Sequence, residues 1–286
     1  SISFLFFVPF VIGFIRVHYE CKINRDLTFG RMAIIAWQPI FVFLLVTMVT
    51  LLEGSICVLL ALPAFMFFSS LGGMVAGKVY QLSSAYNNSS LMSVSILPFL
   101  LFPIENEFLH LSQIYKIKNS IVIDSPINIV WEQLANVSEI KQNEFPSSIT
   151  SVMGIPKPVK ANMNGTGVGS VRTSYWEKEV MFNEVITSWE VNSKLTYKFD
   201  INPDVIPDHA LDKHVKLGGK YFSPLTGGYY LTTNGQGQTI LTIDTVVLDN
   251  TNFGIYSKIW GEVIFHDFHE SLLYLMKSRA EKAIDA

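Results

Sequence analysis

The stretch Ser120-Ile-Val-Ile-Asp-Ser-Pro-Ile-Asn-Ile-Val-Trp131 marks the opening of a water-soluble domain. Residues 116–124 partly alternate apolar and polar side chains, which predicts a β-strand. Ser125 then suits a helix N-cap, and Pro126 suits the first helical position. Apolar residues follow at helical spacing: Ile127, Val130, Trp131 and Leu134. The stretch therefore predicts a strand that passes directly into a short helix.

Strand patterns dominate the chain downstream of this opening. A second short helix is expected over 138–143, and strands are expected over 167–176, 180–191, 194–202, 227–233 and 239–248. Short turns join these strands, which favours an antiparallel sheet with one face to bury. A long helix over 252–284 ends the chain. The sequence therefore predicts an α+β domain in which a curved antiparallel sheet wraps around the terminal helix.

The terminal helix is amphipathic, because charged residues alternate with a set of apolar ones. The apolar positions are Tyr256, Ile259, Trp260, Val263, Ile264, Leu272, Leu275 and Met276. We expect this face to lie against the sheet. A helix across a concave sheet need not fill it, and the gap would form an apolar cavity for a small molecule.

The chain upstream of the domain has a different character. Residues 1–104 contain five of the 21 Lys and Arg and three of the 24 Asp and Glu. A helix needs about 20 apolar residues to cross a bilayer. We therefore expect a transmembrane helical block over 1–108 and a soluble domain over 109–286. The candidate spans are 2–15, 32–52, 56–76 and 91–104, of which the last is the weakest because it is short and carries two prolines.

Small residues recur in the third candidate span and could let helices approach closely. They are Ser69, Ser70, Gly72, Gly73 and Gly77. Packing within the block is the expected role, and the alternative is contact with a partner subunit. Glu53 lies between two apolar runs, where we expect it at the water interface.

The positive-inside rule orients the block. Loop 16–31 holds four of the block's five cations and should be cytoplasmic. If 91–104 crosses the membrane, the soluble domain is extracytoplasmic, which is the favoured topology. If 91–104 only lies in the interface, the domain is cytoplasmic.

Charge and motifs exclude several classes of function. The formal net charge of −3 argues against nucleic acid as a partner. Gly165-Thr-Gly-Val-Gly169 precedes a predicted strand and not a helix, so it indicates a turn and not a nucleotide loop. The segment with Asp208, His209, Asp212 and His214 matches no metal motif and is expected to be a polar loop. No metal and no cofactor is expected.

The chain resembles the START/Bet v 1-like superfamily, also called SRPBCC or polyketide cyclase-like. The resemblance covers about 115–284 and rests on the opening stretch, on Gly165-Thr-Gly-Val-Gly-Ser-Val-Arg172, on Val185-Ile-Thr-Ser-Trp-Glu190 and on the closing helix. It implies a helix-grip fold. The superfamily includes lipid carriers, hormone receptors, cyclases and hydrolytic or dehydrating enzymes, so the resemblance implies no single function.

A closer resemblance covers the whole chain. It is to bacterial membrane-bound SRPBCC proteins, and it includes Phe7-Val-Pro-Phe10, Glu53-Gly-Ser-Ile-Cys57 and Ser70-Leu-Gly-Gly73. This resemblance implies an integral protein of a bacterial inner membrane.

Asp267 is the expected acid or base of a catalytic alternative, with His266 as a second candidate. Asp267 lies seven residues after Trp260 and four after Val263, on the face expected to meet the sheet. A carboxylate there needs a partner, for which Arg172 is a candidate. His269 lies three residues beyond His266, and we expect both to be half-buried or surface histidines.

Residues expected to line a ligand cavity come from the helix and the strands. They are Trp260, Val263, Ile264, Asp267, Arg172, Trp176 and Tyr229. Three functions stay open. The first is membrane-anchored binding or transfer of a hydrophobic small molecule or lipid. The second is an accessory subunit of a membrane complex, and the third is a cyclase- or dehydratase-like enzyme.

Overall fold

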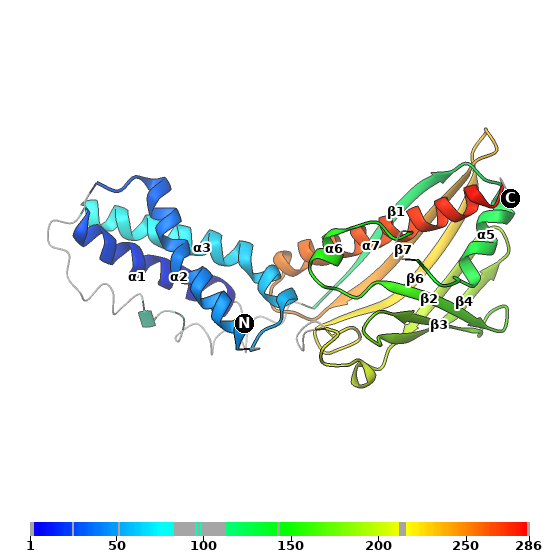
Figure 1. Cartoon of the computed structure of the whole chain (residues 1–286), viewed down its shortest axis with the longest axis horizontal. Coiled ribbons are helices and arrows are strands. Elements are labelled where there is room, and N and C mark those ends of the chain that lie inside the picture. The colour runs from blue at the N-terminus through cyan, green and yellow to red at the C-terminus, as the bar shows by residue number, and fades with distance from the viewer. Residues whose placement is uncertain are drawn as a thin grey trace. The chain divides into compact units, whose positions relative to one another are not determined.

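Three apolar helices form the N-terminal part of the chain, shown in blue to cyan in Figure 1. The computed structural model describes residues 3–24, 26–50, 52–82, 95–96, 98, 112–141, 144–211 and 216–284. Within these ranges the chain divides into two units, Ser1–Leu111 and Ser112–Ala286.

The helices of the first unit are long and apolar enough to cross a membrane. A π-helical turn, Ser3–Phe7, leads into α1, Val8–Ile23; α2 is Phe29–Val49 and α3 is Ser55–Leu82. The expected spans at 32–52 and 56–76 agree with α2 and α3. The first span runs to Ile23 and not to residue 15, because Arg16 does not end the helix. The expected span at 91–104 falls almost wholly outside the described residues.

Arg16 can lie within the first helix because its charge is compensated there. Its Nη1 donates to Glu20 Oε2 at 2.7 Å, and its Nη2 donates to Gln38 Oε1 at 3.0 Å. The pair with Glu20 has the i, i+4 spacing that places both side chains on one face. The helix therefore continues past the arginine, because an acidic residue one turn later compensates its charge.

Small residues hold the first unit together. A Cβ added at Gly13 or Gly72 would collide with a backbone carbonyl of the facing helix, that of Ser69 or Phe10. Ser69 Oγ donates to the carbonyl of Ala36 at 2.7 Å, which joins α3 to α2. Close backbone approach and interhelical hydrogen bonds are the usual means of helix association in lipid. These small residues thus serve contacts inside the bundle.

The second unit is a seven-stranded, fully antiparallel sheet with three helices. Its strands are β1 (Gln113–Ile123), β2 (Pro158–Asn164), β3 (Val171–Trp176), β4 (Met181–Glu190), β5 (Lys194–Asp200), β6 (Phe222–Thr233) and β7 (Thr239–Asp249). The strand order is β1-β7-β6-β5-β4-β3-β2. The helices are α5 (Ile127–Ala135), α6 (Ile149–Val152) and α7 (Ile255–Lys282), and a 3-10 turn spans Pro203–Val205.

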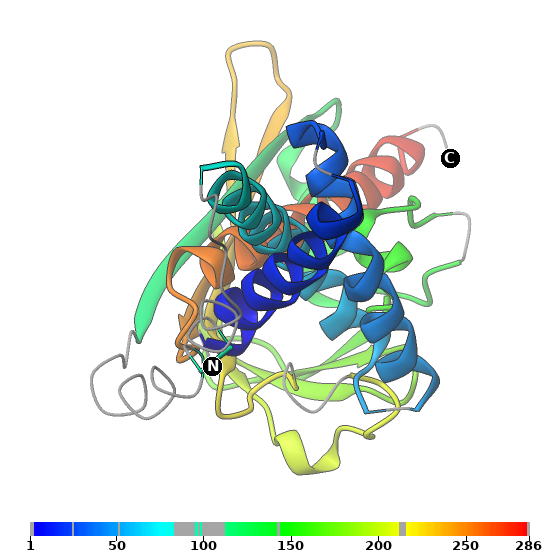
Figure 2. The same cartoon turned by 90° about the vertical axis from the view of Figure 1, so that its left-hand side faces the viewer.

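The sheet curves around α7, which crosses its concave face (Figure 1). The turn between β6 and β7 extends beyond the neighbouring strands in both Figure 1 and Figure 2. This arrangement confirms the predicted α+β helix-grip fold.

Two predicted details are wrong. Described residues 138–141 are not helical; the second short helix is α6, where the Ser148 side chain and backbone form a capping box with Ser151. The strand β2 was missed, because Pro158–Asn164 has little apolar alternation to mark it. The glycine turn is confirmed, since Gly165, Gly167 and Gly169 all have positive φ between β2 and β3.

The buried face of α7 also differs from the predicted one. Its buried residues are Gly261, His269, Ser271, Leu273, Leu275, Met276 and Ala280. Ile259, expected inside, is 52% exposed. The prediction weighted large apolar side chains, whereas small residues fill many inward positions. At Gly261 a Cβ would collide with the Tyr115 hydroxyl, so only glycine lets the helix come this close to β1.

Candidate functional site

The interior of the helix grip has a sealed end, packed around α5 and the C-terminal half of α7. Side chains there are fully buried: Ile123, Val130, Leu134, Leu195, Leu241, Leu275 and Ala280. They belong to one continuous core cluster that also includes Trp131 and Met276. These side chains form a close-packed core.

A buried ion pair lies next to this sealed end. Arg172 Nε on β3 donates to Glu184 Oε2 on β4, and the exposed fractions of the two side chains are only 3% and 7%. Arg172 Nη1 also donates to the Leu134 carbonyl at 2.6 Å, and Ser174 Oγ donates to Glu184 Oε1 at 3.2 Å. A buried charge is tolerated only when it is paired and hydrogen-bonded, as both charges are here.

Two tyrosines complete the surroundings of Arg172. Its Cζ lies 4.9 Å from the ring centroid of Tyr197 and 5.4 Å from that of Tyr229. Tyr197 fits because Gly227 faces it across β5 and β6, where a Cβ would touch its ring. Burial lowers the pKa of the guanidinium, but Glu184 and the tyrosines outweigh burial and raise it. Arg172 is therefore a permanent cation between two aromatic faces.

Besides these fully buried side chains, β3, β5, β6 and α7 carry aromatic side chains that are only part-buried. These are Trp176, Phe199, Phe222, Phe265 and Phe268, which we call the aromatic end. Trp176 lies 5.3 Å from Phe268 of α7, and Phe222 lies 5.9 Å from Phe265 of α7, between ring centroids. Rings of the sheet and of the helix thus meet there without being fully enclosed.

A polar chain links α7 to β1 and β7. Asn119 Oδ1 lies 2.7 Å from His266 Nδ1 and 3.1 Å from His269 Nδ1, and Thr245 Oγ1 lies 2.9 Å from His269 Nε2. Burial, and then the nearby His266, lower the pKa of His269 to about 4. His269 is therefore neutral, with Nδ1 donating to Asn119 and Nε2 accepting from Thr245.

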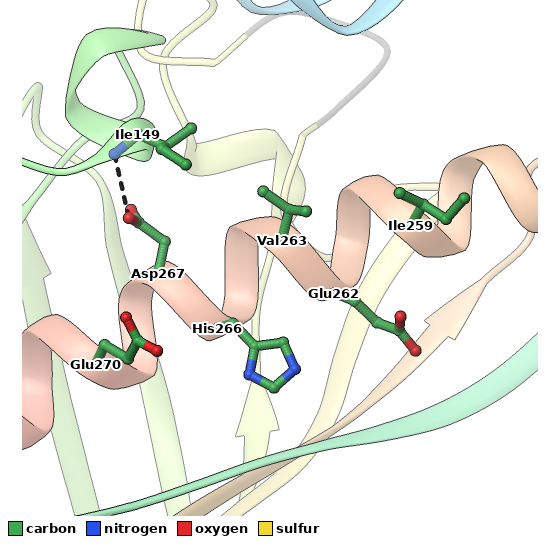
Figure 3. Close-up of a pocket in the computed structure, with 7 residues that line it drawn as sticks. All are labelled: Ile149, Ile259, Glu262, Val263, His266, Asp267 and Glu270. Atoms are coloured by element: carbon green, nitrogen blue, oxygen red, sulfur yellow. Dashed lines mark hydrogen bonds between the residues drawn. The ribbon is translucent and has the colours of Figure 1, made fainter.

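Asp267 does not face the sheet, which corrects the prediction. It lies with Ile149, Ile259, Glu262, Val263, His266 and Glu270 along an open groove on the outer side of α7 (Figure 3). Its carboxylate accepts from the backbone N of Ile149 at 3.1 Å and of Thr150 at 3.0 Å. Burial raises the pKa of Asp267, but the hydrogen bonds from Thr150, Ser148 and Ile149 lower it overall.

The predicted site residues thus fall into separate places. Arg172, Trp176 and Tyr229 lie inside the grip, whereas Val263, His266 and Asp267 line the outer groove. Trp260 and Ile264 are part-buried on α7. The expected partnership between Arg172 and Asp267 is wrong, because Arg172 pairs with Glu184. Sequence reasoning missed Glu184, although it lies two residues from the inward-facing Phe182 and Ile186 on the same strand.

The polar loop between β5 and β6 is partly described. His209 is exposed, and Asp208 pairs with Lys216 at 2.6 Å. Asp212 and His214 lie outside the described residues. Within the described ranges, the structure contains no group of three or more His, Cys, Asp and Glu side chains that could hold a metal.

Comparisons with known proteins find neither a matching family model nor a matching curated protein. Solved structures are similar to the second unit. A protein of unknown function from Staphylococcus aureus is 7% identical to this chain, with a TM-score of 0.41. The match covers 61% of this chain and 98% of that protein. The Zhui aromatase/cyclase from Streptomyces sp. R1128 is 12% identical with a TM-score of 0.39, covering 60% and 96%. Truncated norcoclaurine synthase from Thalictrum flavum is 12% identical with a TM-score of 0.37, covering 60% and 94%.

Proposed function

We propose that this chain is a membrane-anchored protein whose helix-grip domain binds a hydrophobic small molecule or lipid at the aromatic end. The observation that carries the proposal is the contrast between the two ends of the interior. The core around α5 has fully buried side chains at its centre, whereas five aromatic side chains at the aromatic end are part-exposed. Part-exposed aromatic side chains on facing elements are the usual lining of a small-molecule site.

The buried ion pair sets the depth of the proposed site. Arg172 and Glu184 are hydrogen-bonded to each other, and they also bond the Leu134 carbonyl and Ser174, respectively. Displacing any of these partners would leave a buried charge uncompensated, which is costly. A ligand therefore stops at this layer and does not reach the sealed end.

The polar groups inside favour binding over catalysis. Asp267, the expected acid or base, lies on the outer side of α7 (Figure 3). Glu184 is held by Arg172 and Ser174, and His269 is hydrogen-bonded at both ring nitrogens. Each of these groups has a structural partner within the domain, which supports a binding role.

The helical block supports the membrane part of the proposal. Three helices are long and apolar enough to span a bilayer. We place them in a bacterial inner membrane, with the loop between α1 and α2 in the cytoplasm and, with 91–104 as a fourth crossing, the domain on the extracytoplasmic side. A ligand drawn from the bilayer would then reach a domain that cannot diffuse away from it.

Binding is tested with the full chain in lipid nanodiscs and an apolar fluorophore, N-phenyl-1-naphthylamine. We expect saturable binding that is weakened in Trp176→Ala and Phe268→Ala. Met181→Ala on β4, whose side chain is 45% exposed, is the matched control. Mass spectrometry of lipid extracts from the purified chain identifies a native ligand. Equal binding by all variants with unchanged circular dichroism would refute the proposed site.

A further inference from the structure

The end of the domain where the chain enters β1 is a defined surface, which we call the tethered pole. It comprises Ser112–Ile114, Lys220–Tyr221 and Asn250–Ile259. Ser112 Oγ donates to Asn250 Oδ1 at 2.7 Å, and the Asn250 backbone N donates to the Tyr221 carbonyl at 2.9 Å. Gln113 Nε2 donates to the Gly254 carbonyl at 2.9 Å, beside the first turn of α7. These bonds hold the start of β1, the start of β6 and the start of α7 together.

Large apolar side chains are exposed on the tethered pole. Ile255 is 78% exposed, Ile114 64%, Ile259 52% and Tyr221 40%. Ile255 and Ile259 are one turn apart and therefore share one side of α7. Exposed apolar side chains that gather on one surface mark a contact with a partner or a membrane.

The polar residues of the tethered pole indicate whether it contacts a protein partner or a membrane. Lys220 Nζ lies 5.6 Å from the ring centroid of the exposed Tyr221, and Lys258 lies on α7 between Ile255 and Ile259. Tyrosine beside lysine, next to exposed aliphatic side chains, is typical of the headgroup region of a bilayer. Residues 105–286 are acidic, with 16 basic and 21 acidic side chains, so charge alone would not hold the domain there.

The chain enters the domain at the same pole. Residues 83–111 join Leu82, the last residue of α3, to Ser112. The domain is thus tied at this end to helices that can span a bilayer. Exposed valines also occur at the other end of the sheet, at 69% for Val168 and 64% for Val191, but each stands in a separate turn.

We propose that the tethered pole rests on the bilayer surface, with Tyr221, Ile255 and Ile259 among the lipid headgroups. This inference rests on the proposed membrane anchoring and adds a second contact made by the domain itself. Phe222 follows Tyr221 directly, and it packs against Phe265 of the aromatic end. Docking at this pole would therefore bring Phe222 close to lipid, from which an apolar ligand would enter.

The test uses the full chain with Cys21→Ala and Cys57→Ala, reconstituted into phosphatidylcholine liposomes. A single cysteine at Ile255→Cys or Val191→Cys carries the environment-sensitive fluorophore NBD. We expect the label at 255 to emit further to the blue than the label at 191. We also expect it to lose emission as doxyl-labelled lipid replaces ordinary lipid. If Ile255→Cys fails to fold, Ile259→Cys makes the same test on the same side of α7.

Two outcomes would overturn the inference. Equal emission and equal quenching at 255 and 191 would show that the pole stands in water. A blue shift at 255 without quenching by labelled lipid would show that protein covers the pole, either a partner or a second copy. Lipid quenching at 255 together with absent fluorophore binding in nanodiscs would refute the proposed ligand site and leave the docking inference standing.

Discussion

Arg172 and Glu184 are ion-paired across β3 and β4 in the interior of the helix grip, with side chains only 3% and 7% exposed. Arg172 and Glu184 stand directly opposite each other in the register of the two strands. Removing one member of a buried ion pair leaves the other charge without a partner, and this lowers the stability of the fold by about 3–5 kcal/mol in typical proteins. The pair therefore makes the fold sensitive to single substitutions at two inward-facing positions.

We expect Glu184→Gln to lower the unfolding free energy by about 3–5 kcal/mol, because Arg172 would keep its charge without a carboxylate. Glu190→Gln is the control on the same strand, since Glu190 is 56% exposed and pairs with Lys194 at 3.3 Å. Exposed pairs of this kind contribute about 0–1 kcal/mol. Denaturant unfolding of the full chain in detergent, followed by near-ultraviolet circular dichroism, compares the two. Equal losses would contradict the assignment of a buried pair.

Tyr115 and Gly261 provide a second test of packing. The Tyr115 hydroxyl is buried without a hydrogen-bond partner among the described residues, and it would collide with a Cβ at position 261. Gly261→Ala should destabilise the domain by about 1–3 kcal/mol through overpacking. Tyr115→Phe should be neutral or stabilising, because it removes a buried hydroxyl that has no hydrogen-bond partner among the described residues. The double variant should recover most of the loss in thermal unfolding, and purely additive effects would argue against this contact.

His269 should make stability depend on pH. Its pKa is about 4 in the folded chain against an ordinary 6.5, so the folded state disfavours the protonated ring. The stabilisation is complete above the ordinary pKa and is lost as pH falls from 6.5 toward 4. The loss is at most about 3 kcal/mol, from 1.36 kcal/mol per pKa unit.

Unfolding free energies measured between pH 4 and 8 test this prediction. His269→Gln should flatten the dependence in that range, whereas His209→Gln, at an exposed position, should leave it in place. Nitrogen chemical shifts in nuclear magnetic resonance should report a neutral His269 ring at pH 5. A charged ring at that pH would contradict the assignment.

Asp267 should act as the anchor of α6. Asp267→Asn weakens the acceptor for the backbone N atoms of Ile149 and Thr150, and hydrogen exchange at both amides should become faster. Glu270→Gln, in the same groove, should not change it. Since the pKa of Asp267 is lowered, the anchor is fully present above the ordinary carboxyl pKa and weakens as pH falls through the lowered one. Unchanged hydrogen exchange at these two amides in Asp267→Asn would contradict the proposal that Asp267 anchors α6.

The fold could be predicted from periodicity, and the site only in part. Alternation marks β4 and β5 in the sequence because their inward residues are apolar, as with Ile186 and Leu195. The inward face of α7 could not be found in the same way, because Gly261, Ser271 and Ala280 carry no apolar signal. A pattern of large apolar residues instead selected Ile259 and Val263, which lie along the outer groove.

The partners of charged residues were the least predictable feature. Arg172 was found as an inward cation, but its partner depends on which strands are neighbours. Glu184 is 12 residues away along the chain and beside Arg172 only in the sheet register. His269 likewise meets Asn119 across 150 residues. Such contacts follow from topology, which composition and spacing do not specify.

The pairing of β1 with β7 has a consequence for how the domain is made. Gln113 pairs with Asp249 and Ile123 pairs with Thr239. The first strand of the domain can therefore form its sheet hydrogen bonds only after the last strand is present. Pairings between distant parts of a chain form slowly. During synthesis β1 would leave the ribosome early, as an unpaired strand. The nascent domain thus exposes an aggregation-prone edge until residue 249 is available.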